Sequence, residues 1–66
     1  MRRKLQEARN AAKLSQKQVA DRLGIGLRMY QYIESGEKLG AIRLWDALED
    51  MLETPQRELR EVDMNL

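Results

Sequence analysis

Two polar side chains in the middle of the chain, Arg28 and Gln31, have the chemistry needed to read DNA bases. A guanidinium can donate two hydrogen bonds to guanine O6 and N7, and a glutamine amide can pair with adenine. Each residue also has a plainer interpretation, because Arg28 is equally suited to a phosphate contact and Gln31 to a solvated surface. Arg28 is the better candidate for a base contact.

A second set of polar residues is suited to bind phosphate. Gln16 is expected in the first turn of a helix, where free backbone N–H groups and the positive end of the helix attract phosphate oxygens. Basic residues elsewhere would add affinity and salt dependence without sequence preference. The candidates for phosphate contacts are Gln16, Lys17, Lys38, Arg43, Arg2, Arg3 and Lys4. For any single lysine of this set, a solvated surface position is an equally good interpretation.

The composition excludes several other kinds of chemistry. The chain has no cysteine and no histidine, so it has no disulfides, thiol nucleophiles or imidazole bases, and nearly all zinc sites are excluded. The clustered carboxylates of Glu49, Asp50 and Glu53 fit a solvated helix face. We therefore expect no enzyme, no metal, no cofactor and no small-molecule ligand. Short apolar runs predict no membrane span and no signal peptide, and a cytoplasmic location is expected.

Charge is distributed unevenly along the chain, although the net charge is only +1. Residues 1–45 carry ten basic and four acidic side chains, a net charge of +6. Residues 46–66 carry two basic and seven acidic side chains, a net charge of −5. This asymmetry is typical of a domain that presents one side to phosphate, although a solvated helical surface rich in both charges is the plainer interpretation.

The stretch from residue 14 to 36 predicts two short helices joined by a tight turn. Ser15 and Gln18 form a capping box, which predicts that the first of these helices begins at Gln16. Its apolar face consists of Val19, Ala20 and Leu23. Gly24 is suited to the left-handed conformation that ends helices, and Ala20 is small enough for a close helix crossing.

The second of these helices begins at Gly26 and is expected to separate core residues from an exposed face. The core residues are Met29, Tyr30 and Ile33. The residues on the opposite face are Leu27, Arg28, Gln31, Tyr32 and Ser35. Two helices joined in this way have the layout of a helix-turn-helix, and the exposed face is the candidate reading surface.

Three further helices complete a predicted all-α bundle of five helices in one domain, residues 1–66. A helix over residues 3–12 would bury Leu5, Ala8 and Ala12. A helix over about residues 41–53 would bury Ile42, Trp45, Leu48 and Leu52. Thr54 as the cap and Pro55 in the first turn predict a last helix over residues 55–61, with Leu59 and Val62 facing inward. Residues 62–66 alternate apolar and polar side chains, which favours a disordered tail over a dimer contact.

The motifs in this order resemble the phage repressor and Cro-like helix-turn-helix family, often called the Xre family, from about residue 5 to residue 59. The residues that carry the resemblance are Leu14, Ser15, Gln16, Val19, Ala20, Leu23, Gly24, Ile25, Tyr30, Ile33, Glu34, Gly36, Ile42, Trp45, Leu48 and Leu52. The resemblance implies a lambda-repressor-like fold. Two positions depart from the family pattern: Gly26 replaces a Ser or Thr cap, and Gly40 stands where a proline is frequent.

The resemblance also implies roles for single residues. In that family, the residue at the position of Gln16 clamps the DNA backbone and reaches back to the recognition helix. Leu27 and Tyr32 occupy positions that read bases, and here they suit apolar contact with a thymine methyl group or a sugar edge. Arg9 and Glu34 match an ion pair between the first helix and the end of the recognition helix.

These patterns lead to a first and a second functional hypothesis. The first is a sequence-specific transcriptional regulator that binds the major groove of double-stranded DNA. It would be a phage-type or prophage-type repressor, acting as a homodimer on a palindromic operator. The second is a protein-interaction module, such as an antitoxin or an adaptor, that docks through Leu27, Met29 and Tyr32. The acidic Glu37, placed after the recognition helix, favours the second hypothesis.

Overall fold

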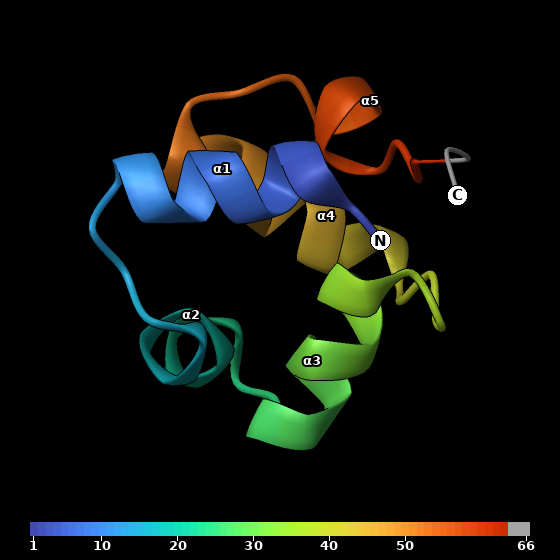
Figure 1. Ribbon diagram of the computed structural model, residues 1–66. Coiled ribbons are helices and arrows are strands. Elements are labelled where there is room, and N and C mark those ends of the chain that lie inside the picture. The colour runs from blue at the N-terminus through green and yellow to red at the C-terminus, as the bar shows by residue number, and fades with distance from the viewer. Residues whose placement is uncertain (64–66) are drawn as a thin grey trace.

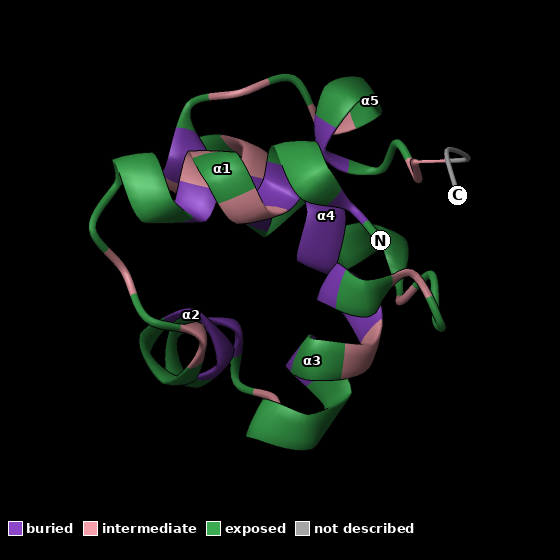
Figure 2. Ribbon diagram, in the orientation of Figure 1, coloured by how far each residue is buried: buried purple, intermediate pink, exposed green. Residues whose placement is uncertain are grey.

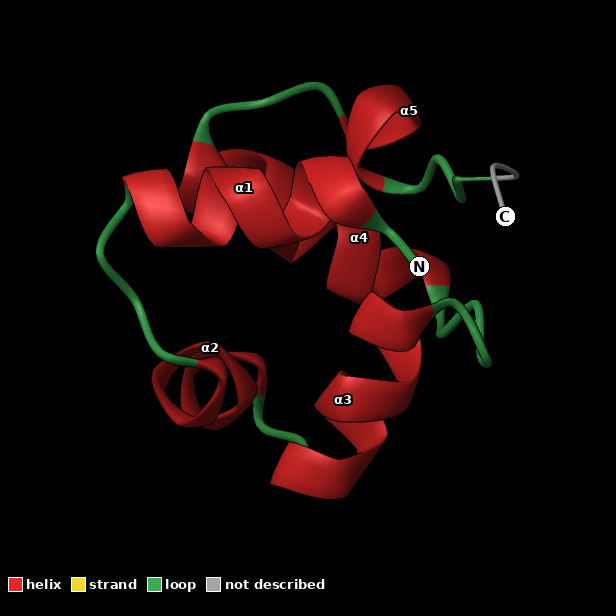
Figure 3. Cartoon of the chain, viewed as in Figure 1, coloured by secondary structure: helices red, strands yellow, loops and turns green. Residues whose placement is uncertain are grey.

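The computed structural model describes residues 1–63, which contain five helices and no strand (Figure 3). The helices are α1 (Arg3–Ala11), α2 (Gln16–Leu23), α3 (Leu27–Ser35), α4 (Ile42–Leu52) and α5 (Gln56–Leu59). Helices α2 and α3 pack against each other, and α1 contacts α3 and α5 (Figure 1). Helix α4 contacts α2 and α5. The predicted all-α bundle is confirmed.

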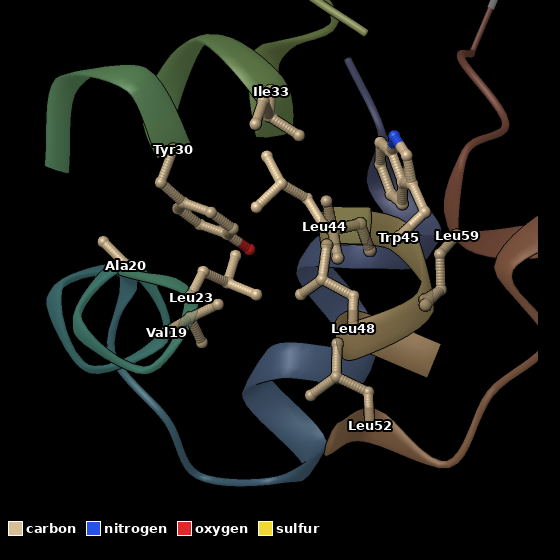
Figure 4. Packing of buried hydrophobic residues seen from close by; sticks show 11 residues of the cluster. Val19, Ala20, Leu23, Tyr30, Ile33, Leu44, Trp45, Leu48, Leu52 and Leu59 are labelled. Carbon is tan, nitrogen blue, oxygen red and sulfur yellow. The ribbon is translucent and has the colours of Figure 1, made fainter. Parts of the chain in front are cut away.

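The core is formed by apolar side chains from all five helices (Figure 4). Its buried members are Leu5, Val19, Ala20, Leu23, Tyr30, Ile33, Leu44, Trp45, Leu48, Leu52 and Leu59. Trp45 and Tyr30 are the largest fully buried side chains. The ring of Tyr30 extends from α3 into the space between α2 and α4, and α3 is therefore anchored to the bundle through its inner face.

The turn between α2 and α3 has the local structure that the sequence predicts. The Ser15 hydroxyl accepts a hydrogen bond from the Gln18 backbone N–H at 3.0 Å, and the Gln18 side chain accepts one from the Ser15 N–H at 2.8 Å. Gly24 ends α2 with φ of 73°, in the left-handed region. Ala20 is fully buried where the two helices meet. The capping box, the helix end and the close crossing are all confirmed.

Three residues predicted to lie in the core are exposed, and those predictions are wrong. Ala12 follows the end of α1, and the chain turns away from the bundle there. Met29 is 37% exposed, because the buried face of α3 is narrow and consists of Tyr30, Ile33 and Glu34. Ile42 is 73% exposed. It is the first residue of α4 and lies outside the buried face of that helix, which includes Leu44 and Trp45.

The last helix is shorter than predicted, and its cap comes from another helix. Pro55 precedes α5 as its N-cap residue, and α5 ends at Leu59. The hydroxyl of Thr54 donates to the Leu52 carbonyl and does not cap α5. The Glu49 carboxylate of α4 instead accepts a hydrogen bond from the Gln56 N–H at 3.1 Å, which satisfies a donor of the first turn.

The described part of the C-terminal segment runs beside the N-terminus. The Asp63 N–H donates to the Met1 carbonyl at 2.9 Å, and Asp63 also pairs with Arg3 at 3.0 Å. Val62 is half-buried beyond the end of α5. Residues 62 and 63 of the predicted tail thus make contacts within the domain, and Val62 faces inward as predicted. The prediction of a disordered tail at Met64, Asn65 and Leu66 lies outside the described residues.

Candidate nucleic-acid interface

The N-terminal half of α3 is exposed over several consecutive positions (Figure 2). Leu27, Arg28 and Gln31 are exposed, and Tyr32 is half-buried. Gly26 precedes the helix with extended backbone and no side-chain cap, so the first N–H groups of α3 receive no side-chain partner there. The four residues predicted to read bases therefore lie on one helix that is buried only along its inner face.

A chain of side-chain hydrogen bonds connects this exposed face with the interior. The Gln31 amide nitrogen donates to the Gln16 carbonyl oxygen at 3.2 Å. The Gln16 amide nitrogen in turn donates to the Glu34 carboxylate at 2.9 Å. Gln16 is thus held between two residues of α3 that lie one turn apart.

Glu34 forms the predicted ion pair with Arg9. The Arg9 guanidinium donates to both carboxylate oxygens, at 2.8 Å and 3.1 Å, and a third bond reaches the Leu14 carbonyl at 2.8 Å. The Tyr30 hydroxyl donates to the same carboxylate at 2.7 Å, which satisfies the one polar group that this core tyrosine brings inside. The pair joins α1 to the end of α3 across 25 residues of sequence.

The hydrogen bonds among Arg9, Gln16, Tyr30 and Glu34, the buried cluster, determine which of its groups are charged. Burial opposes the charge on Glu34, but hydrogen bonds from Arg9, Tyr30 and Gln16 outweigh that effect and lower the pKa of the carboxyl group. Burial, together with the bond to Glu34, raises the pKa of Tyr30. Glu34 is therefore a carboxylate that only accepts hydrogen bonds, and Tyr30 remains a donor.

Stability is expected to fall in acid because of Glu34. Its lowered pKa means that the folded state holds the charged form more tightly than the unfolded chain does. This contribution is full above the ordinary carboxyl pKa of about 4.3 and is lost as the pH falls through the lower folded value. Urea unfolding measured between pH 7 and pH 3 should show this decline. A Glu34→Gln variant should decline less steeply, and an equal slope would contradict the assignment.

The comparison with known families agrees with this geometry. The helix-turn-helix family model HTH_3 matches residues 5–55, which run from within α1 to the residue before α5. The chain belongs to this helix-turn-helix family. It is the family of Xre-, Cro- and lambda-repressor-like DNA-binding regulators. No match was found among curated proteins or among solved structures.

In this helix-turn-helix protein, α3 holds the place of the recognition helix, and the loop after it is tightly bound to the core. The Trp45 indole N–H donates to the Leu39 carbonyl at 2.7 Å. Gly40 has φ of 82°, a backbone conformation that proline cannot adopt. The departure from the frequent proline of the family therefore has a conformational reason. Within residues 1–63, no helix is long and apolar enough to cross a membrane.

The basic side chains predicted to bind phosphate fall into two groups. Lys17, Lys38 and Arg43 are exposed on or next to the helix-turn-helix. Lys17 pairs with Asp21 on its own helix at 2.9 Å, and the Lys38 ammonium lies 5.6 Å from the centre of the Tyr32 ring. Both contacts are solvent-accessible and leave donors free for a phosphate.

The second group consists of Arg2, Arg3 and Lys4 at the N-terminus, whose side chains bind other parts of the protein. Arg2 is only 3% exposed, and the prediction that it binds phosphate is wrong. Arg3 and Lys4 are exposed but pair with acidic residues of the C-terminal segment. The Lys4 ammonium lies 3.3 Å from the Glu61 carboxylate. Arg2 and Arg3 are adjacent and of the same type, so the sequence does not indicate which of the two is buried.

The Arg2 guanidinium holds three segments of the backbone together. It donates to the carbonyls of Ile33 at 2.5 Å, Lys38 at 2.9 Å and Arg60 at 3.0 Å. It also lies 5.2 Å from the centre of the Trp45 indole. Burial lowers its pKa, but a guanidinium remains charged at neutral pH. Arg2 therefore ties the C-terminal end of the recognition helix to the loop that follows it.

Proposed function

We propose that this protein is a sequence-specific transcriptional regulator that inserts α3 into the major groove of DNA. The observation that carries the proposal is the exposed face of α3, which presents Arg28 and Gln31, with Gln31 bonded to the α2 amide of Gln16. Family membership supports DNA binding by this element. The chemistry of the face supports guanine contact by Arg28 and apolar contact with thymine by Leu27 and Tyr32.

We further propose a phage-type repressor that acts in the cytoplasm as a homodimer on a palindromic operator. A single domain of 66 residues makes few base contacts, and two copies on half-sites about one helical turn apart supply the missing affinity. Phosphate contacts come from Gln16, Lys17, Lys38 and Arg43. Arg3 and Lys4 would first have to leave their partners in the C-terminal segment.

The experiment that tests this proposal is selection of bound sequences from a randomised DNA duplex pool at physiological salt. A palindromic consensus whose affinity falls steeply with salt is the expected result. Half-site spacing then follows from the consensus. Absence of enrichment would overturn the proposal and favour a protein-interaction module. The observation behind that second candidate is the exposure of apolar side chains, 37% for both Leu27 and Met29.

Replacing a base-reading residue and replacing a phosphate-binding residue should have different effects on DNA affinity. Arg28→Ala is expected to relax base preference at one position of each half-site, at a cost of about 1–3 kcal/mol for the preferred base. Lys38→Ala should weaken binding to all sequences alike and reduce the salt slope by about one. Binding of the selected and of a scrambled duplex, measured across a salt series, separates the two effects. Equal losses on both duplexes for Arg28→Ala would contradict its assigned role.

A further inference from the structure

The loop between α3 and α4 is held in place through its backbone. The Lys38 carbonyl accepts a hydrogen bond from the Arg2 guanidinium at 2.9 Å. The next carbonyl, that of Leu39, accepts one from the Trp45 indole at 2.7 Å. The Lys38 N–H donates to the Tyr32 carbonyl at 3.2 Å. Both peptide groups that flank the Lys38 side chain are therefore bonded to partners outside the loop.

The two side chains that hold these carbonyls also contact each other, and one of them is bonded to the end of α3. The Arg2 guanidinium lies 5.2 Å from the centre of the Trp45 indole. The Arg2 backbone N–H donates to the Glu34 carbonyl at 2.8 Å, and its guanidinium donates to the Ile33 carbonyl at 2.5 Å. These carbonyls belong to the last turn of α3, where a helix lacks internal donors and favours a positive charge. Arg2 therefore fixes the loop relative to the recognition helix.

This anchoring determines where the Lys38 side chain lies. Lys38 is exposed, and its ammonium lies 5.6 Å from the centre of the Tyr32 ring. Tyr32 is on the face of α3 that would enter the major groove, so the ammonium is held beside that face. A hydrogen bond to a phosphate oxygen requires about 3 Å between the two atoms, and displacement of the loop would break it.

We propose that Arg2 and Trp45 are positioning residues for DNA binding, which hold Lys38 where it reaches a phosphate of the operator. This inference rests on the proposed function, because it requires that Lys38 binds phosphate. Arg2 is 3% exposed and Trp45 is 1% exposed, so neither side chain is available to the DNA itself. Loss of their hydrogen bonds to the loop should therefore remove the same phosphate contact as loss of the Lys38 side chain.

The test measures dissociation constants of the wild type, Arg2→Met, Lys38→Ala and the double variant R2M/K38A across a salt series. The selected and a scrambled duplex are used at about 10 °C, near the temperature of maximum stability of small domains. Circular dichroism gives the folded fraction of each variant, and each constant is expressed per folded molecule. Arg2→Met should lower affinity for both duplexes by about fivefold at about 0.15 M salt and reduce the salt slope by about one, as for one lost phosphate contact. The double variant should bind no more weakly than Lys38→Ala.

Two control variants separate positioning from charge and from stability. Arg2→Lys keeps the positive charge but not the planar fork of donors, and it should lose the Lys38 contact as Arg2→Met does. Leu52→Ala truncates a core side chain at the last residue of α4, away from the loop, and should lower Tm as Arg2→Met does. Its folded fraction should nevertheless bind both duplexes with the wild-type affinity and salt slope.

Trp45→Phe keeps an aromatic ring in the core and removes the N–H that Leu39 accepts, so it tests the loop anchor even if Arg2→Met does not fold. It should reduce the salt slope in the same direction. Wild-type affinity and salt slope in the folded fraction of Arg2→Met or of Trp45→Phe would overturn this inference and leave the proposed function intact. A loss in Arg2→Met that persists in full beside Lys38→Ala would also overturn it. Absence of any sequence preference in the wild type would overturn the proposed function as well.

Discussion

The variant Glu34→Ala is expected to lose about 3–5 kcal/mol of unfolding free energy, the usual cost of breaking a buried ion pair. The change leaves the Arg9 guanidinium and the Tyr30 hydroxyl without their carboxylate partner. A domain of this size has a total stability of similar magnitude, so a large fraction of the variant should be unfolded at 25 °C. Urea denaturation followed by circular dichroism measures the loss.

Two further variants show whether the loss comes from the cluster. Arg9→Ala should cost less than Glu34→Ala, because Tyr30 and Gln16 still donate to the remaining carboxylate. Asp21→Ala breaks the exposed pair with Lys17 and should change stability by less than about 1 kcal/mol. Equal stability of Glu34→Ala and Asp21→Ala would show that the buried cluster does not hold α1 to α3.

The second large effect is expected for Arg2→Met, which keeps most of the side-chain length and removes the charge and its donors. Three carbonyl groups lose a charged partner, and hydrogen bonds to charged groups contribute about 1.5–3 kcal/mol each. Allowing for partial replacement by water, we expect a loss of about 2–3 kcal/mol. For a domain of 60–100 residues this corresponds to a decrease of about 10–20 °C in Tm. Thermal unfolding measures it directly.

Arg3→Ala is the matched control for Arg2→Met. Arg3 is the next residue and has the same side chain, but its guanidinium is exposed and pairs with a single half-buried carboxylate, that of Asp63. Its replacement should lower Tm by less than that of Arg2, since an exposed side chain with one partner loses a single contact and not three. Arg2→Lys should behave like Arg2→Met, because one ammonium cannot reproduce the planar fork of a guanidinium. A Tm for Arg2→Met that matches Arg3→Ala would show that the three carbonyl contacts contribute nothing measurable.

The interactions that define the helix-turn-helix join residues that are close in the sequence, and for that reason they could be predicted. Ser15 and Gln18 are three residues apart, and the hydrogen bonds between them need no distant partner. Gly24 ends α2 through its own backbone freedom. The Arg9–Glu34 pair spans a longer distance, and it was predicted only through the resemblance to a family.

Predictions of burial were wrong for residues at the edge of the helix face that packs against the core. Met29 is next to the buried Tyr30, and Ile42 begins α4, so both have the right residue type but lie just outside the buried arcs. Helical periodicity indicates which residues share a face, yet it does not give the width of the face that a neighbour covers. Thr54 failed as a cap for a related reason, since the Glu49 side chain of another helix supplied the partner.

The amino-acid order alone was sufficient for the number and order of the helices, the turn between α2 and α3 and the face of α3 that could meet DNA. It was not sufficient for the roles of the charged residues at the N-terminus. Arg2 and Arg3 have the same chemistry and adjacent positions, but one is buried and the other is exposed. A buried charge requires partners, and those of Arg2 are carbonyl groups at residues 33, 38 and 60. Only the packed chain brings these groups to one place.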